Sequence, residues 1–348
     1  MKILIIQQKM IGDVLTSSIL FEALRAKYPT AQLHYVINTP TYPVVENHPF
    51  IDRFLMVSPD IENSKRHFFK FLKSIRKENY DVVIDVYGKL GSAIMSLFSG
   101  AKIKIAYHKS YTSFIFNQSI SRLHTPQHKA SLAIENRMRL LEPLDIDFIP
   151  YQPKIYLSDL EINKARTLLE TSKVNLQHPL FMISVLGSSA IKTYPATYMA
   201  SLLDAVVETN PDAQILFNYI PKQKEKAQEI YDGCASLTQK QIYFDIFGKS
   251  LRDFLALNAC CDATIGNEGG ANNMAKALNI PTFTIFSPYL NKKNWFGELE
   301  EDKHTAVHLS DYMDYALADA KQNPADFYRR LKPELIIPKL KSFIRQFN

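Results

Sequence analysis

The sequence contains few cysteines, and their spacing excludes the usual roles of cysteine clusters. Only three occur in 348 residues, Cys234, Cys260 and Cys261. An odd number with two adjacent residues fits neither a disulfide framework nor the paired ligands of a zinc site. This pattern is typical of a cytoplasmic protein, and we expect that location.

The sequence also lacks any apolar run long enough to cross a membrane. The opening run, residues 1–6, ends at Gln7, Gln8 and Lys9. It is too short for a signal-peptide core or a transmembrane helix. We expect it to form a buried first strand.

The excess of positive charge is small. The formal net charge is +6, and no motif of a DNA- or RNA-binding module occurs, so we expect no nucleic-acid partner. The charge is compatible with an anionic substrate or an acidic membrane surface.

Three familiar motifs are missing or incomplete. No Gly-x-Gly-x-x-Gly follows the first apolar run, which argues against a dinucleotide-dependent dehydrogenase. Gly248-Lys249-Ser250 resembles the end of a Walker loop, but Tyr243 stands where the earlier glycine should be. The histidines at 108, 124 and 128 have no metal-ligand spacing, and we expect no metal site.

Short apolar runs alternate with helical patterns in two series. Nearly continuous apolar strands separated by helices are typical of parallel sheets covered by helices on both faces. The sequence therefore predicts an α/β protein with two doubly wound domains. The expected strands are residues 3–6, 33–37, 54–57, 82–86 and 103–106 in the first domain, and 180–185, 214–219, 242–244, 263–265 and 282–286 in the second.

The proline-rich stretch 143–179 indicates the domain boundary. We expect a first domain over 1–155, a connection over 156–178 and a second domain over 179–322. Within the connection, Ser158 followed by Glu161 predicts the start of a helix. Residues 323–348 read as helices opened by Pro324 and by Pro333 or Pro338, and we expect them to pack back on the first domain.

Residues 266–278 are the most informative stretch. The adjacent Gly269 and Gly270 follow an apolar run and open an amphipathic helix, which Pro281 ends. Glycines let backbone N–H groups approach a ligand, and the start of a helix attracts anions, so a diphosphate would suit this place. The alternative is a tight turn whose glycines only permit close packing of helix and strand. These residues alone favour neither interpretation.

A second loop of the same domain has anion-binding chemistry. Gly187, Ser188 and Ser189 follow an apolar run, Lys192 adds a positive charge, and a helix is predicted to start near Pro195. The alternative is an ordinary solvated loop. Gly269-Gly270 in the same domain supports the phosphate interpretation, because two strand ends of one sheet would then converge on one anion.

The first predicted strand is followed by Gly12-Asp13 at the start of a helix. That position places a carboxylate at the carboxyl end of a parallel sheet, where open α/β folds bind their ligands. Asp13 is therefore a candidate general base. The alternative, favoured by these residues alone, is an N-cap or first-turn aspartate stabilised by the helix dipole.

Taken together, these segments resemble the heptosyltransferase family, glycosyltransferase family 9. The resemblance covers nearly the whole chain and rests on the order and spacing of residues 11–15, 100–102, 128–141, 187–195 and 266–278. It implies a GT-B fold, in which two Rossmann-like domains face a cleft. It also implies inverting transfer of a heptose or related sugar from a nucleotide-sugar to a saccharide of lipopolysaccharide or a related cell-envelope glycan.

The resemblance also implies roles for individual residues. Asp13 matches the proposed base and Lys192 the phosphate-contacting lysine, with no metal or other cofactor required. The acceptor would be an anionic, lipid-linked saccharide at the inner face of the cytoplasmic membrane, which the enzyme would contact peripherally. The remaining donor-binding candidates are Gly187, Ser188, Ser189, Glu268, Gly269, Gly270, Ala271 and Asn273. The acceptor-binding candidates are Gly12, Lys89, Lys109, Arg122, Lys129 and Arg137, although any one of these charges is by itself more typical of a solvated surface.

Several positions depart from the family pattern. Glu268-Gly269 stands where the family has Asp followed by Thr or Ser, Asn273 replaces a histidine, and Leu186 replaces a proline. Residues 221–223 lack the acidic residue that relatives use to bind the ribose of an ADP-sugar. The donor nucleotide and sugar therefore stay open. Two alternatives also remain: a nucleotide-sugar epimerase or other GT-B enzyme, and a non-catalytic sugar-nucleotide-binding protein.

Overall fold

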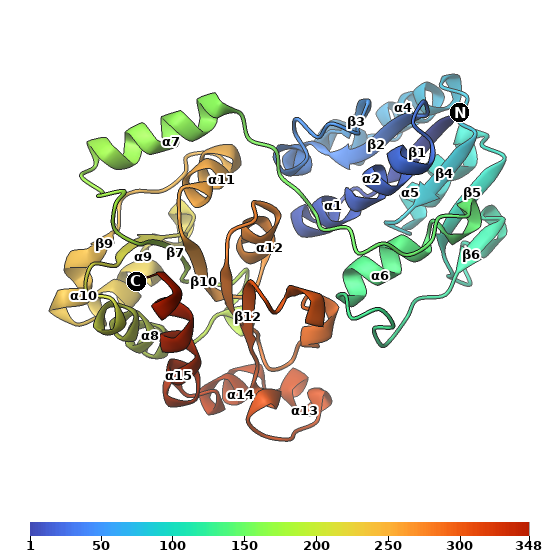
Figure 1. Ribbon diagram of the computed structural model, residues 1–348. Helices are drawn as coiled ribbons and strands as arrows, with labels where there is room; N and C mark the ends of the chain where they lie inside the picture. Colours follow the sequence, from blue (N-terminus) through green and yellow to red (C-terminus); the bar gives the residue numbers. More distant parts are fainter. Residues whose placement is uncertain (348) are drawn as a thin grey trace. The chain divides into compact units, whose positions relative to one another are not determined.

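The computed structural model describes residues 1–347, which divide into two compact units. The first unit comprises Met1–Tyr156 together with the short segment Lys293–Glu298. The second comprises Leu157–Lys292 and the described residues from Leu299 onward. Each unit is an α/β fold built on one sheet (Figure 1).

The first unit contains a six-stranded parallel sheet with the strand order β3-β2-β1-β4-β5-β6. Its strands are β1 Lys2–Ile6, β2 Gln32–Asn38, β3 Arg53–Val57, β4 Val82–Asp85, β5 Ile103–Tyr107 and β6 Gln118–Ile120. Its helices are α1 Ile11–Ser17, α2 Ile19–Lys27, α3 Pro59–Asn63, α4 Lys65–Lys77, α5 Leu90–Ser99 and α6 Leu132–Arg139.

The second unit repeats this arrangement with the order β12-β11-β10-β7-β8-β9, again all parallel. Its strands are β7 Leu180–Ser184, β8 Gln214–Phe217, β9 Ile242–Tyr243, β10 Ala263–Asn267, β11 Thr282–Ile285 and β12 His304–Val307. Its helices are α7 Asp159–Thr171, α8 Ala196–Thr209, α9 Lys224–Asp232, α10 Ser236–Gln241, α11 Leu251–Ala259, α12 Gly270–Ala277, α13 Leu317–Gln322, α14 Pro324–Arg330 and α15 Pro333–Ile344.

Both sheets have the strand order of a Rossmann fold, counted from the first strand of each unit. The predicted pair of doubly wound domains is therefore confirmed. The order reverses between β1 and β4 in the first unit and between β7 and β10 in the second. Open α/β sheets bind ligands outside the carboxyl ends of the strands at such a reversal.

Apolar strands in the middle of each sheet form the cores. Residues 3–6 of β1 and all of β7 are buried, which explains their nearly continuous apolar sequences. The edge strands β6 and β12 were not predicted. The residues of β6, Gln-Ser-Ile, are largely exposed, and β12 begins with the half-buried His304 and Thr305, so neither strand reads as an apolar run.

The connection between the units begins a helix where the sequence predicted one. Ser158 caps α7, and its side chain and that of Glu161 form a reciprocal capping box. The Arg252 guanidinium of α11 lies 2.6 Å from Glu161 Oε1 and lowers the pKa of that carboxyl to about 2. These contacts hold α7 within the second unit.

The expectation that residues 323–348 pack on the first domain is wrong for the described residues, which end at 347. They belong to the second unit, and Leu340, Phe343 and Ile344 of α15 lie in its core. The rings of Phe343 and Phe283 are 5.7 Å apart. Tyr194 Oη also donates a 2.6 Å hydrogen bond to the Leu331 carbonyl. The apolar face of the tail therefore covers the sheet that carries β11.

The cysteines are free, and two of them are buried. Burial raises the pKa of the Cys234 thiol to about 12, so it stays protonated near neutral pH. Over residues 1–347, the structure contains no helix with the length and apolarity needed to span a bilayer.

Candidate active site

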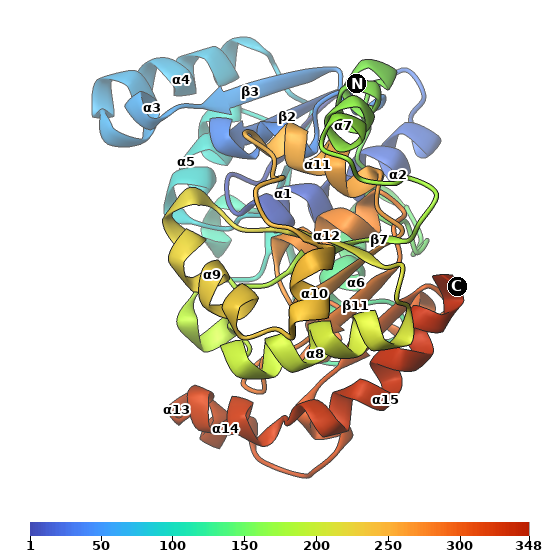
Figure 2. The same cartoon turned by 90° about the vertical axis from the view of Figure 1, so that its left-hand side faces the viewer.

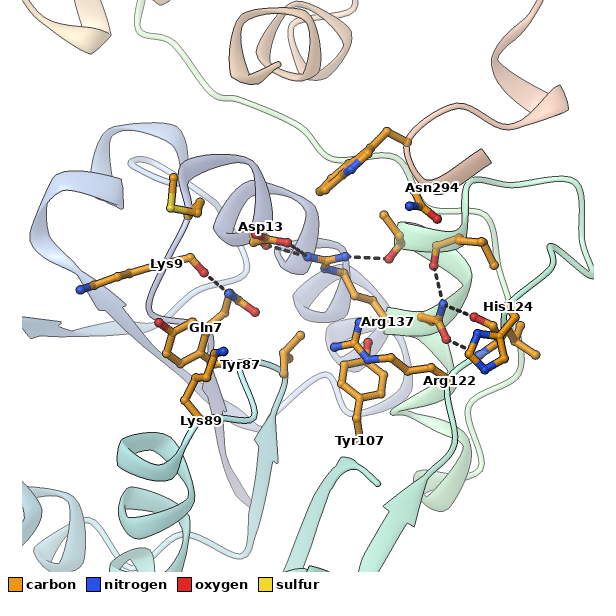
Figure 3. Close-up of a pocket in the computed structure, with 17 residues that line it drawn as sticks. Gln7, Lys9, Asp13, Tyr87, Lys89, Tyr107, Arg122, His124, Arg137 and Asn294 are labelled. Atoms are coloured by element: carbon orange, nitrogen blue, oxygen red, sulfur yellow. Dashed lines mark hydrogen bonds and ion pairs between the residues drawn. The ribbon is translucent and has the colours of Figure 1, made fainter. Parts of the chain in front are cut away.

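A pocket of about 570 Å³ opens at the carboxyl edge of the first sheet, where the strand order reverses. Residues that follow β1, β4 and β6 line it, together with the end of β5 and one side of α6 (Figure 3). The segment 293–298 of the same unit adds Asn294 and Trp295. This is the place at which a doubly wound sheet binds its ligand.

Asp13 lies in the first turn of α1 and lines this pocket. The N-cap of the helix is Met10, and no side chain makes a capping hydrogen bond there. Asp13 is therefore not the N-cap, whereas the other form of that alternative, an aspartate in the first turn, describes its position. Its side chain is 37% exposed, so the carboxylate is accessible to a ligand in the pocket.

The buried Arg137 of α6 orients the Asp13 carboxylate (Figure 3). Its Nη2 donates a 2.8 Å hydrogen bond to Asp13 Oδ1, its Nε donates to Ser17 Oγ at 2.8 Å, and its Nη1 donates to the Ala133 carbonyl at 2.9 Å. A guanidinium bonded in three directions has one preferred position. Among residues 1–347, Asp13 Oδ2 accepts no hydrogen bond, so this oxygen remains available to a ligand.

Three of the predicted acceptor residues line the pocket with Asp13. They are Lys89, Arg122 and Arg137, and the Arg122 guanidinium lies 3.8 Å from the centre of the Tyr107 ring. The other three do not line it. Gly12 lies in the first turn of α1, Lys109 Nζ donates to the Gly88 carbonyl, and Lys129 Nζ lies 3.6 Å from Glu298 Oε2.

The sequence interpretation missed several residues that line the pocket. Gln7, Tyr87 and Tyr107 stand at or just beyond the ends of β1, β4 and β5. Asp13 was predicted because it follows a strand at the carboxyl end of a parallel sheet, and the same criterion would have identified these three residues. Asn136 holds the loop after β6, because its Oδ1 accepts from the Leu123 N–H at 2.7 Å. For Trp295, no local pattern in the sequence indicates that it returns to the first unit.

In the second unit, β10 leads through Glu268 and Gly269 into α12. The first backbone bond of this helix joins the Asn273 N–H to the Gly269 carbonyl at 3.2 Å. The N–H groups of Gly270, Ala271 and Asn272 therefore precede the helical ladder, and such groups bind anions. Gly270 is exposed, Ala271 is buried and Asn273 is half-buried.

The glycines of this segment have different roles. A Cβ on Gly266 would lie 2.5 Å from the Ser184 carbonyl oxygen, so this glycine permits close packing of β10 on β7. Gly269 has a φ of 151°, which favours glycine. A Cβ on Gly270 would meet Met274 Cε at 3.8 Å, an ordinary contact, at a φ outside the left-handed region. The packing alternative thus explains Gly266 but not Gly270.

The loop after β7 is folded tightly on itself. The Gly187 N–H donates to Thr193 Oγ1 at 3.1 Å, and Thr193 Oγ1 donates to the Ser189 carbonyl at 2.8 Å. A Cβ on Gly187 would lie 2.2 Å from the Lys192 carbonyl oxygen, so Gly187 is needed for this turn. Ser188 and Ser189 are exposed on it.

Asn267, a residue that the sequence interpretation missed, joins the two loops. Its side chain is buried, its Nδ2 donates to the Ser184 and Val185 carbonyls at 2.9 Å each, and its Oδ1 accepts from the Tyr194 N–H at 2.6 Å. The ends of β7 and β10 therefore carry their loops side by side.

Lys192 and Glu268 meet at this junction. Lys192 Nζ lies 3.2 Å from Glu268 Oε1, although this buried oxygen accepts no aligned hydrogen bond within the described residues. A buried carboxylate without an aligned donor is costly. A phosphate at these loops would compete with Glu268 for the lysine. In residues 1–347, no group of three or more His, Cys, Asp or Glu side chains is arranged to hold a metal ion.

The family model described as glycosyltransferase family 9 (heptosyltransferase) matches residues 68–308, which include the loops after β7 and β10 and most of the pocket-lining residues. The chain belongs to this family. The protein is thus a glycosyltransferase, as the resemblance implied, and the family assignment favours sugar transfer over the epimerase alternative.

Individual relatives match over most or all of the chain. The chain is 24% identical to lipopolysaccharide heptosyltransferase 1 of Campylobacter coli over 302 residues, which covers 85% of this chain and 86% of that protein. The family 9 glycosyltransferase from Veillonella parvula superposes with a TM-score of 0.83 at 17% identity, covering 99% of this chain and 97% of that one. The E. coli heptosyltransferase WaaC, solved with ADP-2-deoxy-2-fluoro heptose, has a TM-score of 0.70 at 16% identity and 99% coverage of both chains. These structures confirm the GT-B fold.

Proposed function

We propose that the first unit binds an anionic, lipid-linked saccharide acceptor and the second a nucleotide-sugar, and that Asp13 is the general base of an inverting transfer. The observation that carries this proposal is the Asp13 carboxylate, held in the pocket by Arg137 with one oxygen available. Lys89 and Arg122 line the same pocket and would meet anionic groups of the acceptor.

The proposed step begins at the acceptor hydroxyl. Asp13 Oδ2 takes its proton while the hydroxyl oxygen attacks the anomeric carbon of the donor sugar. A new glycosidic C–O bond forms on the face opposite the departing group, and the bond between the anomeric carbon and the phosphate oxygen breaks. A positioned carboxylate contributes to such a step because its basicity acts in the transition state.

The leaving nucleoside diphosphate carries the electron pair of the broken bond. The N–H groups of Gly270 and Ala271 and the Lys192 ammonium would stabilise this charge, since preorganised donors act most strongly where charge develops. The exposed hydroxyls of Ser188 and Ser189 would add hydrogen bonds to the phosphates. When the diphosphate binds, the Lys192 ammonium would leave its ion pair with Glu268 and contact a phosphate oxygen.

We propose an ADP-linked heptose as the donor to test first. WaaC is solved with such a compound. In this chain the residues after β8 form the short turn Pro221–Gln223, and Gln223 Nε2 donates to the Gly187 carbonyl at 3.4 Å. Because this turn has no carboxylate, the nucleotide needs a direct test.

The experiment is a transfer assay with lipid-linked core saccharide and a panel of ADP-, GDP- and UDP-linked sugars, run with and without a chelator. We expect multiple turnovers with an ADP-heptose, unaffected by the chelator. Binding of a nucleotide-sugar without turnover on any acceptor would contradict the proposed transfer.

Replacing Lys192 with Ala should weaken binding of ADP, or of whichever nucleoside diphosphate proves best, by roughly tenfold to a hundredfold. Loss of one charge-assisted contact has about that effect. Isothermal titration calorimetry measures it, with the exposed Lys226 changed to Ala as the charge-matched control. Equal affinities of wild type and Lys192→Ala would remove Lys192 from the site.

Replacing Arg137 with Gln should lower kcat by roughly tenfold, with a smaller effect on the KM for the donor, because the residue acts through Asp13. A double-mutant cycle tests this coupling. In an Asp13→Asn background the Arg137→Gln change should cost little further rate. Additive losses in the cycle would mean that Arg137 acts independently of Asp13.

A further inference from the structure

Helix α4, Lys65–Lys77, is strongly basic. Among its thirteen residues are Lys65, Arg66, Lys70, Lys73, Arg76 and Lys77, and it contains no Asp or Glu. Within residues 1–347, no ion pair joins any of these six side chains to a carboxylate. The helix therefore presents an uncompensated positive charge.

One face of α4 is packed and the other is exposed. Leu72 and Ile75 are buried in the core of the first unit, with Phe68 and Phe71 partly buried against them. Phe69 lies outside this face, is 48% exposed and has the Lys73 ammonium 4.9 Å from the centre of its ring. An exposed phenylalanine among cations is not explained by folding of the unit.

Helix α5 lies beside α4 (Figure 2). Its exposed apolar side chains extend the surface that Phe69 begins. The rings of Phe69 and Phe98 are 6.3 Å apart. Leu90, Leu97 and Phe98 are exposed, and with the half-buried Ile94 they keep the i, i+4, i+7, i+8 spacing of one helix face. At the end of α5, a Cβ on Gly100 would collide with the Arg76 guanidinium, so Arg76 lies directly against this helix.

This α4–α5 surface starts at the acceptor pocket. Lys89 lines the pocket and is the N-cap of α5, and Leu90 is the first residue of the helix. Ten helical residues span about 15 Å, so the exposed apolar side chains extend from the pocket rim towards the basic helix. Both helices belong to the first unit.

We infer that the α4–α5 surface docks the enzyme on an anionic phospholipid bilayer. Lys and Arg on an amphipathic helix bind anionic headgroups, and exposed Phe and Leu side chains enter the headgroup boundary. A soluble anion would be held by the cations alone and would leave Phe69, Leu97 and Phe98 unexplained. The inference rests on the proposed function in one respect: a lipid-linked acceptor enters the pocket from the surface on which α5 lies.

The test is sedimentation of the full chain with vesicles of phosphatidylcholine, with and without phosphatidylglycerol. Wild type should bind the anionic vesicles and lose affinity as salt rises. Changing Lys70, Lys73 and Lys77 together to Gln should weaken this binding by at least roughly tenfold. Phe69→Ser with Leu97→Ser should also weaken it, with the salt dependence retained. The charge-matched control changes Lys222, Lys226 and Lys240, all exposed in the second unit, to Gln.

Transfer to a delipidated, water-soluble acceptor separates this inference from the proposed function. The Lys70, Lys73 and Lys77 triple variant should retain that activity, which also shows that it is folded. Failure of wild type to bind anionic vesicles, or equal losses in the triple and control variants, would overturn the docking surface while leaving the transfer reaction standing. Loss of soluble-acceptor transfer with vesicle binding intact would assign these lysines to the acceptor instead.

Discussion

Replacing Asp13 with Asn should lower turnover by roughly 10²–10⁴-fold, measured with saturating donor and acceptor. The amide has nearly the size of the carboxylate, and its oxygen still accepts from Arg137, so the side chain stays in place. It cannot take a proton from the acceptor hydroxyl. The expected loss is therefore in kcat, with the affinity for the nucleotide-sugar nearly unchanged.

The same variant separates catalysis from stability. A capping aspartate contributes about 0.5–2 kcal/mol, but α1 has no side-chain cap, and the Asp13 carboxylate is partly exposed. We therefore expect little change in melting temperature. Near-wild-type turnover of Asp13→Asn would remove Asp13 as the base and leave only the nucleotide site.

Replacing Gly270 with Val should reduce nucleoside-diphosphate binding more than any single side-chain change nearby, by more than about a hundredfold. A branched side chain at the start of α12 would stand where the phosphate oxygens approach the N–H groups of Gly270 and Ala271. Titration calorimetry with the diphosphate and with the intact donor measures the loss.

Gly266→Ala provides the contrasting variant. Its added Cβ would meet the Ser184 carbonyl oxygen at 2.5 Å and its φ is 127°, so this change should lower the melting temperature. Gly270→Val should instead fold normally, because a Cβ at this position would make only an ordinary contact, 3.8 Å from Met274 Cε. A folded Gly270→Val protein with wild-type donor affinity would mean that the diphosphate lies elsewhere.

The sheets could be predicted because buried parallel strands read as apolar runs. The edge strands β6 and β12 were not predicted, because partly exposed strands carry polar residues and do not read as apolar runs. The sequence spacing of Leu340 and Phe343 places both on one apolar face of the last helix. Spacing shows that such a face is buried but not which sheet it covers, and the assignment of this tail to the first domain was therefore wrong.

Candidate site residues could be found where they directly follow a strand. Asp13 lies just beyond β1, and Lys192 and Gly270 lie in the loops after β7 and β10. The contacts that position them could not be predicted. Arg137 is 124 residues from its partner Asp13, and Asn267 joins β10 to a loop 73 residues away. Such pairings depend on which strands and helices become neighbours, and no local pattern encodes them.

The most direct test of the central claim is the stereochemistry of the product. The wild-type enzyme would be incubated with an ADP-heptose and the core saccharide, and NMR would determine the anomeric configuration of the new glycosidic bond. A single in-line displacement assisted by Asp13 predicts a configuration opposite to that of the donor. A product that retains the donor configuration would contradict it.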